Sequence, residues 1–175
     1  MRNSAFLVAG LFLLLIQANS FRVLGSLEIP GLVPSLVLPI IVFMGVHDYS
    51  LARGASVSFV LGYVTDLVAI APVGLYTFAH VAVFLLARAA SVRLSAQTVL
   101  MQAAFATVFA GIHSGMILVL LAIFGRDAWV PRMLYPLVIP HVLATGLMAP
   151  LVFRIAMRIH ASTQTTIRPA GGVVP

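Results

Sequence analysis

Four polar side chains stand inside apolar stretches of this chain and are the residues that could do chemistry there. Asp66 and His80 lie in the stretch 62–80, which reads "GYVTDLVAIAPVGLYTFAH". His113 and His141 follow in later apolar stretches. A carboxylate and imidazoles together can hold zinc or iron, or relay protons. An unpaired acid at mid-membrane costs about 2.5–3.5 kcal/mol on insertion scales, so we expect a partner for Asp66, with His80 as first choice.

The turn that this stretch predicts at 72–74 places Asp66 and His80 at the same depth. At about 1.5 Å rise per residue, each lies roughly 10 Å from the turn. His141 reaches a similar depth from the same side, and His113 lies somewhat deeper. No spacing among them matches a metal motif, so we expect satisfied structural polar residues and predict no metal ion or cofactor. A metal or proton site is the alternative.

Enzymatic chemistry has little support in the sequence. His113, Ser114 and Gly115, with His141 on the next helix, faintly suggest a rhomboid-type serine protease, but Ile112 stands where that motif needs glycine. An intramembrane aspartyl protease needs two membrane aspartates, and Asp66 is the only one expected in the membrane. The chain has no Cys and no Lys, no phosphate loop and no HExxH motif. We therefore expect no enzyme.

Composition sets the class of the protein. Of 175 residues, 62% are hydrophobic and only 8% are charged, which no soluble domain of this size could keep away from water. The sequence therefore predicts an all-α integral membrane protein, a bundle of about six transmembrane helices. The net charge of +6 comes from Arg residues at the ends of apolar stretches, the positive-inside pattern, so we predict no nucleic-acid partner.

Six apolar stretches must position the polar residues. They are residues 4–19, 29–46, 54–71, 74–90, 98–124 and 134–155. We expect one bundle domain over 1–160 and a disordered cytoplasmic tail over 161–175. The second and sixth stretches carry three prolines each, which can kink a spanning helix. With the N-terminus inside, most Arg residues fall on the inner side, which predicts both termini in the cytoplasm.

Small residues recur every four positions along the third stretch and lead to the acid. They are Gly54, Ser58, Gly62 and Asp66. This spacing keeps them near one helix face, where small residues let another backbone approach closely. The face packs either against a helix of the same chain or against a partner. The fifth stretch has a similar series that could be its mate, namely Ala103, Thr107, Gly111 and Gly115.

Residues 34–88 resemble the rod shape-determining protein MreD family. The matching pieces are "PSLVLPIIVF" and, after a short polar turn, "RGASVSFVLGYVTDLVAIAPVGLYTFAHVAVFLLAR". The family pattern is a Pro-led second helix, a Gly-rich third helix with an intramembrane Asp, a Pro-x-Gly turn and an apolar fourth helix. The positions that carry it here are Pro34, Gly54, Gly62, Asp66, Pro72 and Gly74.

The resemblance implies a non-enzymatic scaffold in the bacterial inner membrane. Such proteins bind MreC and support MreB, RodA and a class B penicillin-binding protein during lateral peptidoglycan synthesis and cell-shape control. The family is also similar in fold to S-components of energy-coupling-factor transporters. The alternative is therefore a small-molecule-binding subunit of such a transporter. That function needs an outward pocket, and the sequence offers few polar residues to line one.

We expect eight positions to be structural or partner-binding rather than catalytic. They are Pro34, Gly54, Ser58, Gly62, Asp66, Pro72, Gly74 and His80. Asp66 would satisfy a buried network between the third and fourth helices, in contact with protein rather than lipid. On that basis Asp66→Asn keeps much of the function, because Asn can accept and donate hydrogen bonds, whereas Asp66→Leu loses it.

Overall fold

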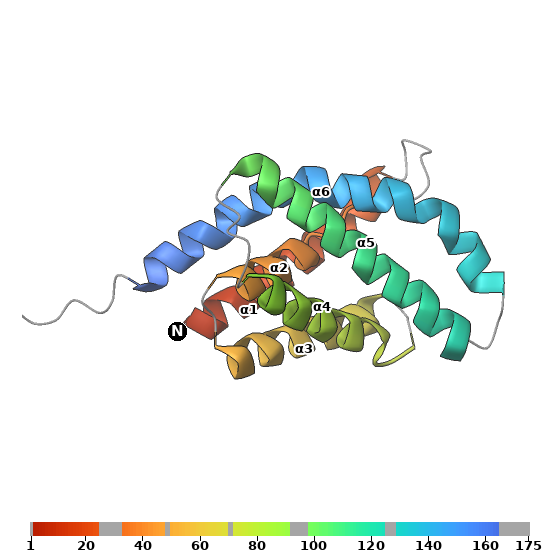
Figure 1. Ribbon diagram of the computed structural model, residues 1–175, viewed down its shortest axis with the longest axis horizontal. Coiled ribbons are helices and arrows are strands. Elements are labelled where there is room, and N and C mark those ends of the chain that lie inside the picture. The colour runs from red at the N-terminus through yellow and green to blue at the C-terminus, as the bar shows by residue number, and fades with distance from the viewer. Residues whose placement is uncertain are drawn as a thin grey trace, which may run out of the picture.

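The described part of the chain is entirely helical. The computed structural model describes residues 2–24, 33–47, 50–69, 72–91, 98–124 and 129–164, and in these parts every regular element is an α-helix (Figure 1). The helices are α1 Arg2–Leu24, α2 Val37–Val46, α3 Leu51–Val68, α4 Leu75–Ser91, α5 Val99–Phe124 and α6 Trp129–Gln164. The expected all-α architecture is therefore present.

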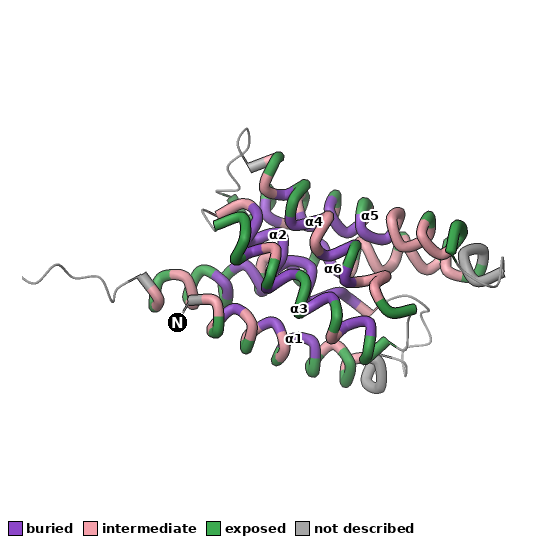
Figure 2. The backbone as a smooth tube through the Cα atoms, turned by 90° about the horizontal axis from the view of Figure 1, so that it is seen from below, coloured by how far each residue is buried: buried purple, intermediate pink, exposed green. Residues whose placement is uncertain are grey.

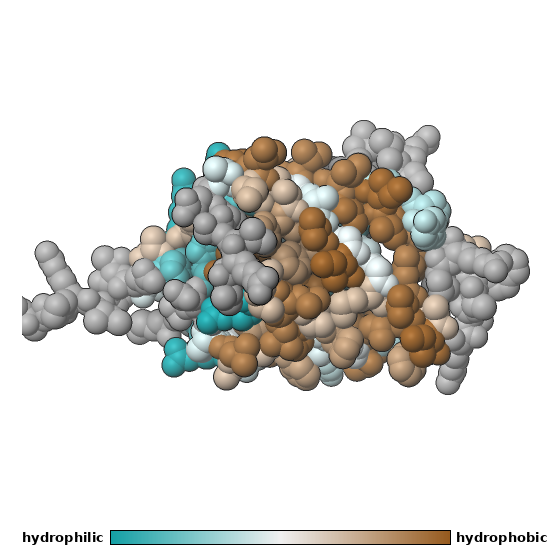
Figure 3. Space-filling view, in the orientation of Figure 1, coloured by the Kyte–Doolittle hydropathy of each residue, from teal (hydrophilic) through white to brown (hydrophobic). Residues whose placement is uncertain are grey.

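Large apolar side chains cover the outside of the molecule. Leu100 and Leu147 are each 79% exposed and Phe124 is 78% exposed. Many other large apolar side chains on α1, α5 and α6 are also exposed. Figure 3 shows this apolar surface over the middle of one face, with hydrophilic residues gathered at the left end. Four helices, α1, α3, α5 and α6, are long and apolar enough to cross a membrane. Lipid is the environment in which such a surface is stable.

The second helix is much shorter than the sequence suggests. Instead of a span over 29–46, α2 has 10 residues, begins at Val37, and is buried over nearly its whole length. Figure 2 shows it in the colour of buried residues, with the other helices around it. Pro34 precedes the helix, and Pro39 falls in its first turn, where its missing N–H has no intrahelical partner to lose. Residues 29–32 lie outside the described part.

Helices α3 and α4 form the expected antiparallel hairpin. The turn between them includes Pro72 and Val73, which are exposed, and Gly74. Gly74 has φ of +100°, a conformation that residues with a Cβ rarely adopt. The N–H of Leu75 donates to the carbonyl oxygen of Pro72 over 3.1 Å and starts α4. The Pro-x-Gly sequence therefore sets where α4 begins.

The sixth helix is longer than its apolar stretch. It contains Pro136, Pro140 and Pro150 and still runs as one helix from Trp129 to Gln164, past the expected limits of 134–155. Residues 161–164 are helical, so the expected boundary of a disordered tail at 161 is wrong there. Residues 165–175 lie outside the described part.

Four arginines whose side chains the structure describes lie toward one end of the bundle. Arg53 is near the start of α3, Arg88 near the end of α4, and Arg154 and Arg158 near the end of α6. These three helix ends and the N-terminus all lie toward the left of Figure 1. The opposite end carries the turn between α3 and α4. The bundle therefore has a basic end and an end where that hairpin turns.

Candidate functional site

Asp66 accepts hydrogen bonds from the first residues of α4. Its Oδ2 accepts from the N–H of Gly74 (2.9 Å), the N–H of Thr77 (3.2 Å) and the hydroxyl of Thr77 (2.6 Å). Its Oδ1 accepts from the N–H of Tyr76 at 2.7 Å. The carboxylate itself is 1% exposed. One buried side chain therefore holds three backbone N–H groups and one hydroxyl.

This arrangement is an N-terminal cap supplied from a neighbouring helix. The first four N–H groups of a helix have no partner within it, and a carboxylate at that end also interacts favourably with the helix dipole. Asp66 lies eight residues before Gly74, so the turn brings the acid of α3 back to the start of α4. Its contribution is to fix the α3–α4 hairpin, as the sequence-based interpretation of a structural role proposes.

The expected pairing of Asp66 with His80 is wrong. The four hydrogen-bond donors to the carboxylate are at the start of α4, about one turn before His80. His80 is buried, and its Nδ1 has no hydrogen-bond partner. Its ring stacks on that of His113, with centroids 5.0 Å apart and planes at 16°. Asp66 therefore lies level with the first turn of α4, and His80 lies about one turn further along that helix.

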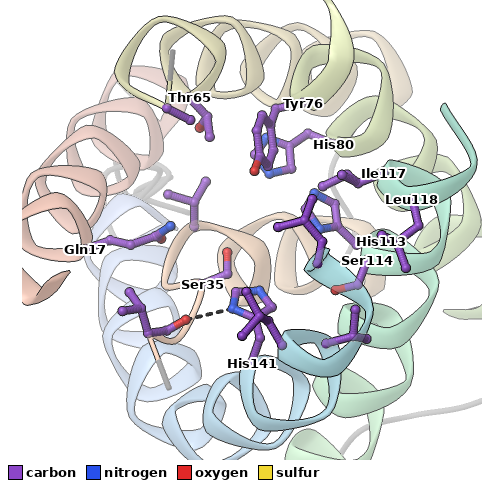
Figure 4. A pocket seen from close by; sticks show the side chains of 16 residues that line it. Gln17, Ser35, Thr65, Tyr76, His80, His113, Ser114, Ile117, Leu118 and His141 are labelled. Carbon is purple, nitrogen blue, oxygen red and sulfur yellow. Dashed lines mark hydrogen bonds between the residues drawn. The ribbon is translucent and has the colours of Figure 1, made fainter. Parts of the chain in front are cut away.

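A cavity of about 410 Å³ lies inside the bundle near the hairpin end. All six helices or their flanking residues surround it, and Figure 4 shows its polar side chains converging from several directions. The polar lining residues are Gln17, Ser35, Thr65, Tyr76, His80, His113, Ser114 and His141. His80, His113 and His141 thus share one layer, as their depths predict, while Asp66 does not line it. The expectation of few polar residues for a pocket is wrong.

The segment before α2 forms part of the cavity wall and is held by side chains. The N–H of Leu36 donates to Oε1 of Gln17 (2.8 Å), and the N–H of Ser35 donates to the hydroxyl of Thr145 (2.9 Å). Nδ1 of His141 donates to the carbonyl oxygen of Val33 over 2.7 Å. Non-helical backbone inside a membrane protein needs such partners. Pro34 lies in this non-helical segment, and proline disfavours a helical conformation of the residue before it.

The small-residue series on α3 packs against α4. A Cβ on Gly62 would lie 2.6 Å from the Cα of Thr77, and one on Gly54 would meet the ring of Phe84. Ser58, between them, is fully buried. These positions therefore act by letting α3 and α4 approach, and their contact with another protein stays a prediction.

The series on α5 is not the mate of the series on α3. A Cβ on Gly111 or Gly115 would meet nothing within 4 Å. Thr107 instead lies against Gly146 of α6, where an added Cβ would collide with its hydroxyl. Four-residue spacing shows which residues share a face but not what covers that face, so sequence alone could not tell these two series apart.

Two functional positions were missed by sequence reasoning. Thr77 donates both its N–H and its hydroxyl to Asp66, and its place three residues after the turn glycine was the available signal. Gly45 on α2 packs so closely on α4 that a Cβ would lie 2.6 Å from the Cβ of Ala87. No periodic neighbour marks Gly45, so only the packed structure identifies it.

No metal site is formed by the described residues. Among residues 2–24, 33–47, 50–69, 72–91, 98–124 and 129–164, no three His, Cys, Asp or Glu side chains are placed to hold an ion.

Comparisons with protein-family models, curated proteins and solved structures find no match to this chain. A proposal of function therefore rests on the contacts of Asp66 and of the cavity, and on the resemblance of residues 34–88 to the MreD family.

Proposed function

We propose that this chain is a non-enzymatic scaffold of the bacterial inner membrane that binds MreC in the cell-elongation complex. The observation that supports this proposal is the set of hydrogen bonds made by Asp66, the intramembrane acid of the MreD family pattern. Both of its oxygens accept hydrogen bonds that fix the α3–α4 hairpin. A buried carboxylate that holds four donors of one helix start contributes rigidity to the hairpin. A rigid hairpin suits a protein that presents one fixed surface to a partner.

The same proposal includes the other members of the cell-elongation complex. MreB, RodA and a class B penicillin-binding protein would be organised through MreC during lateral peptidoglycan synthesis. Because Gly54, Ser58 and Gly62 pack on α4, their effect on binding would be indirect, through the shape of the hairpin. The outward side of α3, which exposes Phe59, Tyr63 and Leu67, is the surface available to lipid or to a partner.

Co-purification tests the scaffold function. Affinity purification of the tagged chain in mild detergent, followed by mass spectrometry, should recover MreC well above its level with an unrelated tagged membrane protein. An energy-coupling ATPase module in the eluate, without MreC, would instead identify the transporter subunit. Recovery of neither, from membranes that contain both, contradicts both functions.

The cavity is the specific observation that favours the second candidate. A small-molecule-binding subunit of an energy-coupling-factor-type transporter needs a pocket, and a cavity of about 410 Å³ falls within the size range of ligand sites. The lining mixes apolar and polar side chains, as ligand sites do. The ATPase module is the partner that separates this candidate from the scaffold.

We also propose that both termini lie in the cytoplasm, with the basic end of the bundle inside. The support is the position of Arg53, Arg88, Arg154 and Arg158 at that end, since Arg and Lys concentrate on cytoplasmic sides. Reporter fusions within 92–97 and at the C-terminus should both report a cytoplasmic location, and a fusion within 70–71 a periplasmic one. A periplasmic C-terminus would show that an odd number of segments crosses the membrane.

A further inference from the structure

His113 lines the cavity with its hydrogen-bonding capacity unused. Its side chain is 3% exposed, and neither Nδ1 nor Nε2 has a hydrogen-bond partner. A neutral imidazole carries one donor and one acceptor, so both are unmet. Nδ1 of His80, whose ring stacks on His113, is also buried and unpartnered. Buried polar groups are normally satisfied, and such exceptions in a cavity wall indicate a missing partner.

Three rings form one wall of this cavity. The ring centroid of Tyr76 lies 6.2 Å from that of His80 and 6.0 Å from that of His113. Figure 4 shows these side chains grouped together, with Gln17 on the opposite side of the cavity. Stacked and tilted rings at such distances hold one another in place. The ring of His113, with its two unmet nitrogens, is therefore held in a fixed position in the cavity wall.

The part of the cavity lining that the structure describes contains no Asp, Glu, Lys or Arg. The acid in the neighbouring helix, Asp66, turns toward α4 instead. An ion placed in this cavity would be desolvated without a counter-charge, which is unfavourable. The lining therefore selects an uncharged occupant.

On α5 and α6 the polar and apolar lining residues lie in separate layers. Ile117 and Leu118 follow His113 by one turn along α5. Leu134, Leu137 and Val138 precede His141 by one to two turns along α6, which runs antiparallel to α5. Both apolar groups consequently lie nearer the α5–α6 connection than the histidines do. An occupant would meet hydrogen-bonding groups at its inner end and apolar side chains along its body.

We propose that this cavity binds a small uncharged amphipathic molecule, whose hydroxyl or N–H group bonds to His113 while its apolar body lies between α5 and α6. The cavity is large enough for a molecule of two fused rings, since an engineered cavity of about 150 Å³ accommodates benzene. Water alone would leave the apolar part of the lining without a partner. This site goes beyond the scaffold function and does not depend on MreC.

An isosteric pair of probes tests the proposal on the purified full chain in detergent. 2-Naphthol and 2-methylnaphthalene have the same size and differ in a hydroxyl against a methyl group. Apparent affinities come from the rise in melting temperature with probe concentration. The wild-type protein should bind 2-naphthol roughly three- to tenfold more tightly, the worth of one net hydrogen bond. Equal shifts for both probes in the wild type would overturn the proposal.

His113→Phe separates the hydrogen bond from the cavity. Phe keeps a flat ring and removes the unmet nitrogens, so the empty protein should be as stable as the wild type or more stable. Both probes should still bind, but the preference for 2-naphthol should fall to about one. A preference that survives in this variant would show that His113 is not the contact, which contradicts the proposal.

Filling the cavity provides a second variant and a matched control. Leu137→Trp places an indole in the lining and should abolish the shifts caused by both probes. Leu147→Trp makes the same change on the same helix at a position that faces outward, and should leave both shifts intact. If neither tryptophan changes the shifts, the probes act through the detergent micelle only and the cavity is not their site.

Discussion

Replacing Gly62 by leucine is expected to destabilise the α3–α4 hairpin strongly. A Cβ at Gly62 would lie 2.6 Å from the Cα of Thr77 and 2.9 Å from the carbonyl oxygen of Tyr76. Carbon atoms pack at about 3.5–4.0 Å, and the crowded atoms here are backbone, which cannot rotate away as a side chain can. The same backbone donates its N–H groups to Asp66, so moving it also breaks the cap.

The expected size of this effect is large for a single substitution. Overpacking a core costs about 1–3 kcal/mol and occasionally more, and we place Gly62→Leu at or above the upper end of that range. At roughly 2–4 °C per kcal/mol for a chain of this size, its melting temperature in detergent should fall by about 6–12 °C or more. Gly62→Ala should show a smaller loss, even though alanine favours helices by about 1 kcal/mol over glycine. Gel-filtration profiles at equal expression should show less monodisperse protein for both.

Gly111→Leu is the matched control for Gly62→Leu. It is also a glycine inside a long apolar helix, but an added Cβ there meets nothing within 4 Å. Its melting temperature should equal or slightly exceed that of the wild type, because leucine is the better helix former. If the melting temperature of Gly62→Leu equalled that of Gly111→Leu, then α3 and α4 would not be in the contact described above.

Replacing Asp66 is expected to release the first turn of α4. Asp66→Leu leaves three backbone N–H groups and the hydroxyl of Thr77 without their acceptor, in a buried place. We expect a loss of about 2–4 kcal/mol, more than an ordinary cap substitution of roughly 0.5–2 kcal/mol, because several bonds are lost together. The melting temperature should fall accordingly. Under the proposed function, recovery of MreC and rod-shaped growth of a complemented deletion strain should fall with it.

The hydrogen bonds change what Asp66→Asn is expected to do. Every group around the carboxylate is a donor, and asparagine offers one acceptor oxygen and one donor NH₂. If the amide NH₂ takes the place of Oδ1, it faces the N–H of Tyr76. If it takes the place of Oδ2, it faces the donors of Gly74 and Thr77. Asn should therefore be intermediate between Asp and Leu, and not close to wild type as amide chemistry alone suggests. Melting temperatures of the three proteins in one detergent measure the order.

Two further substitutions define the scale for Asp66. Ser56→Leu changes an exposed residue of the same helix and should leave the melting temperature unchanged. Thr77→Val removes one donor to Asp66 and keeps the backbone bonds, so it should cost roughly 1 kcal/mol. If Asp66→Asn matched the wild type while Thr77→Val lost stability, the carboxylate would not need acceptors on both oxygens, and the cap as described would be wrong.

Several features of this protein are determined by its sequence alone. The abundance of apolar residues and the scarcity of charge exclude a soluble fold, and the length of the apolar stretches predicts helices. The Pro-x-Gly turn locates the hairpin, because glycine is needed where φ is positive. The spacing from Gly54 to Asp66 also predicts that the acid meets protein and not lipid. These are local or compositional properties, and no knowledge of other helices is needed for them.

The neighbours of each helix face were decided only by the tertiary structure. In lipid, outward and inward faces are both apolar, so the polarity contrast that identifies the core side of a soluble helix is weak. The sequence therefore could not show that α2 is a short buried helix, that the series on α5 is open, or that His80 turns to His113. The sequence also could not identify the hydrogen-bond partners of Asp66, because every helix begins with unpaired N–H groups that could serve. Only the folded hairpin brings those of α4 within reach of that one carboxylate.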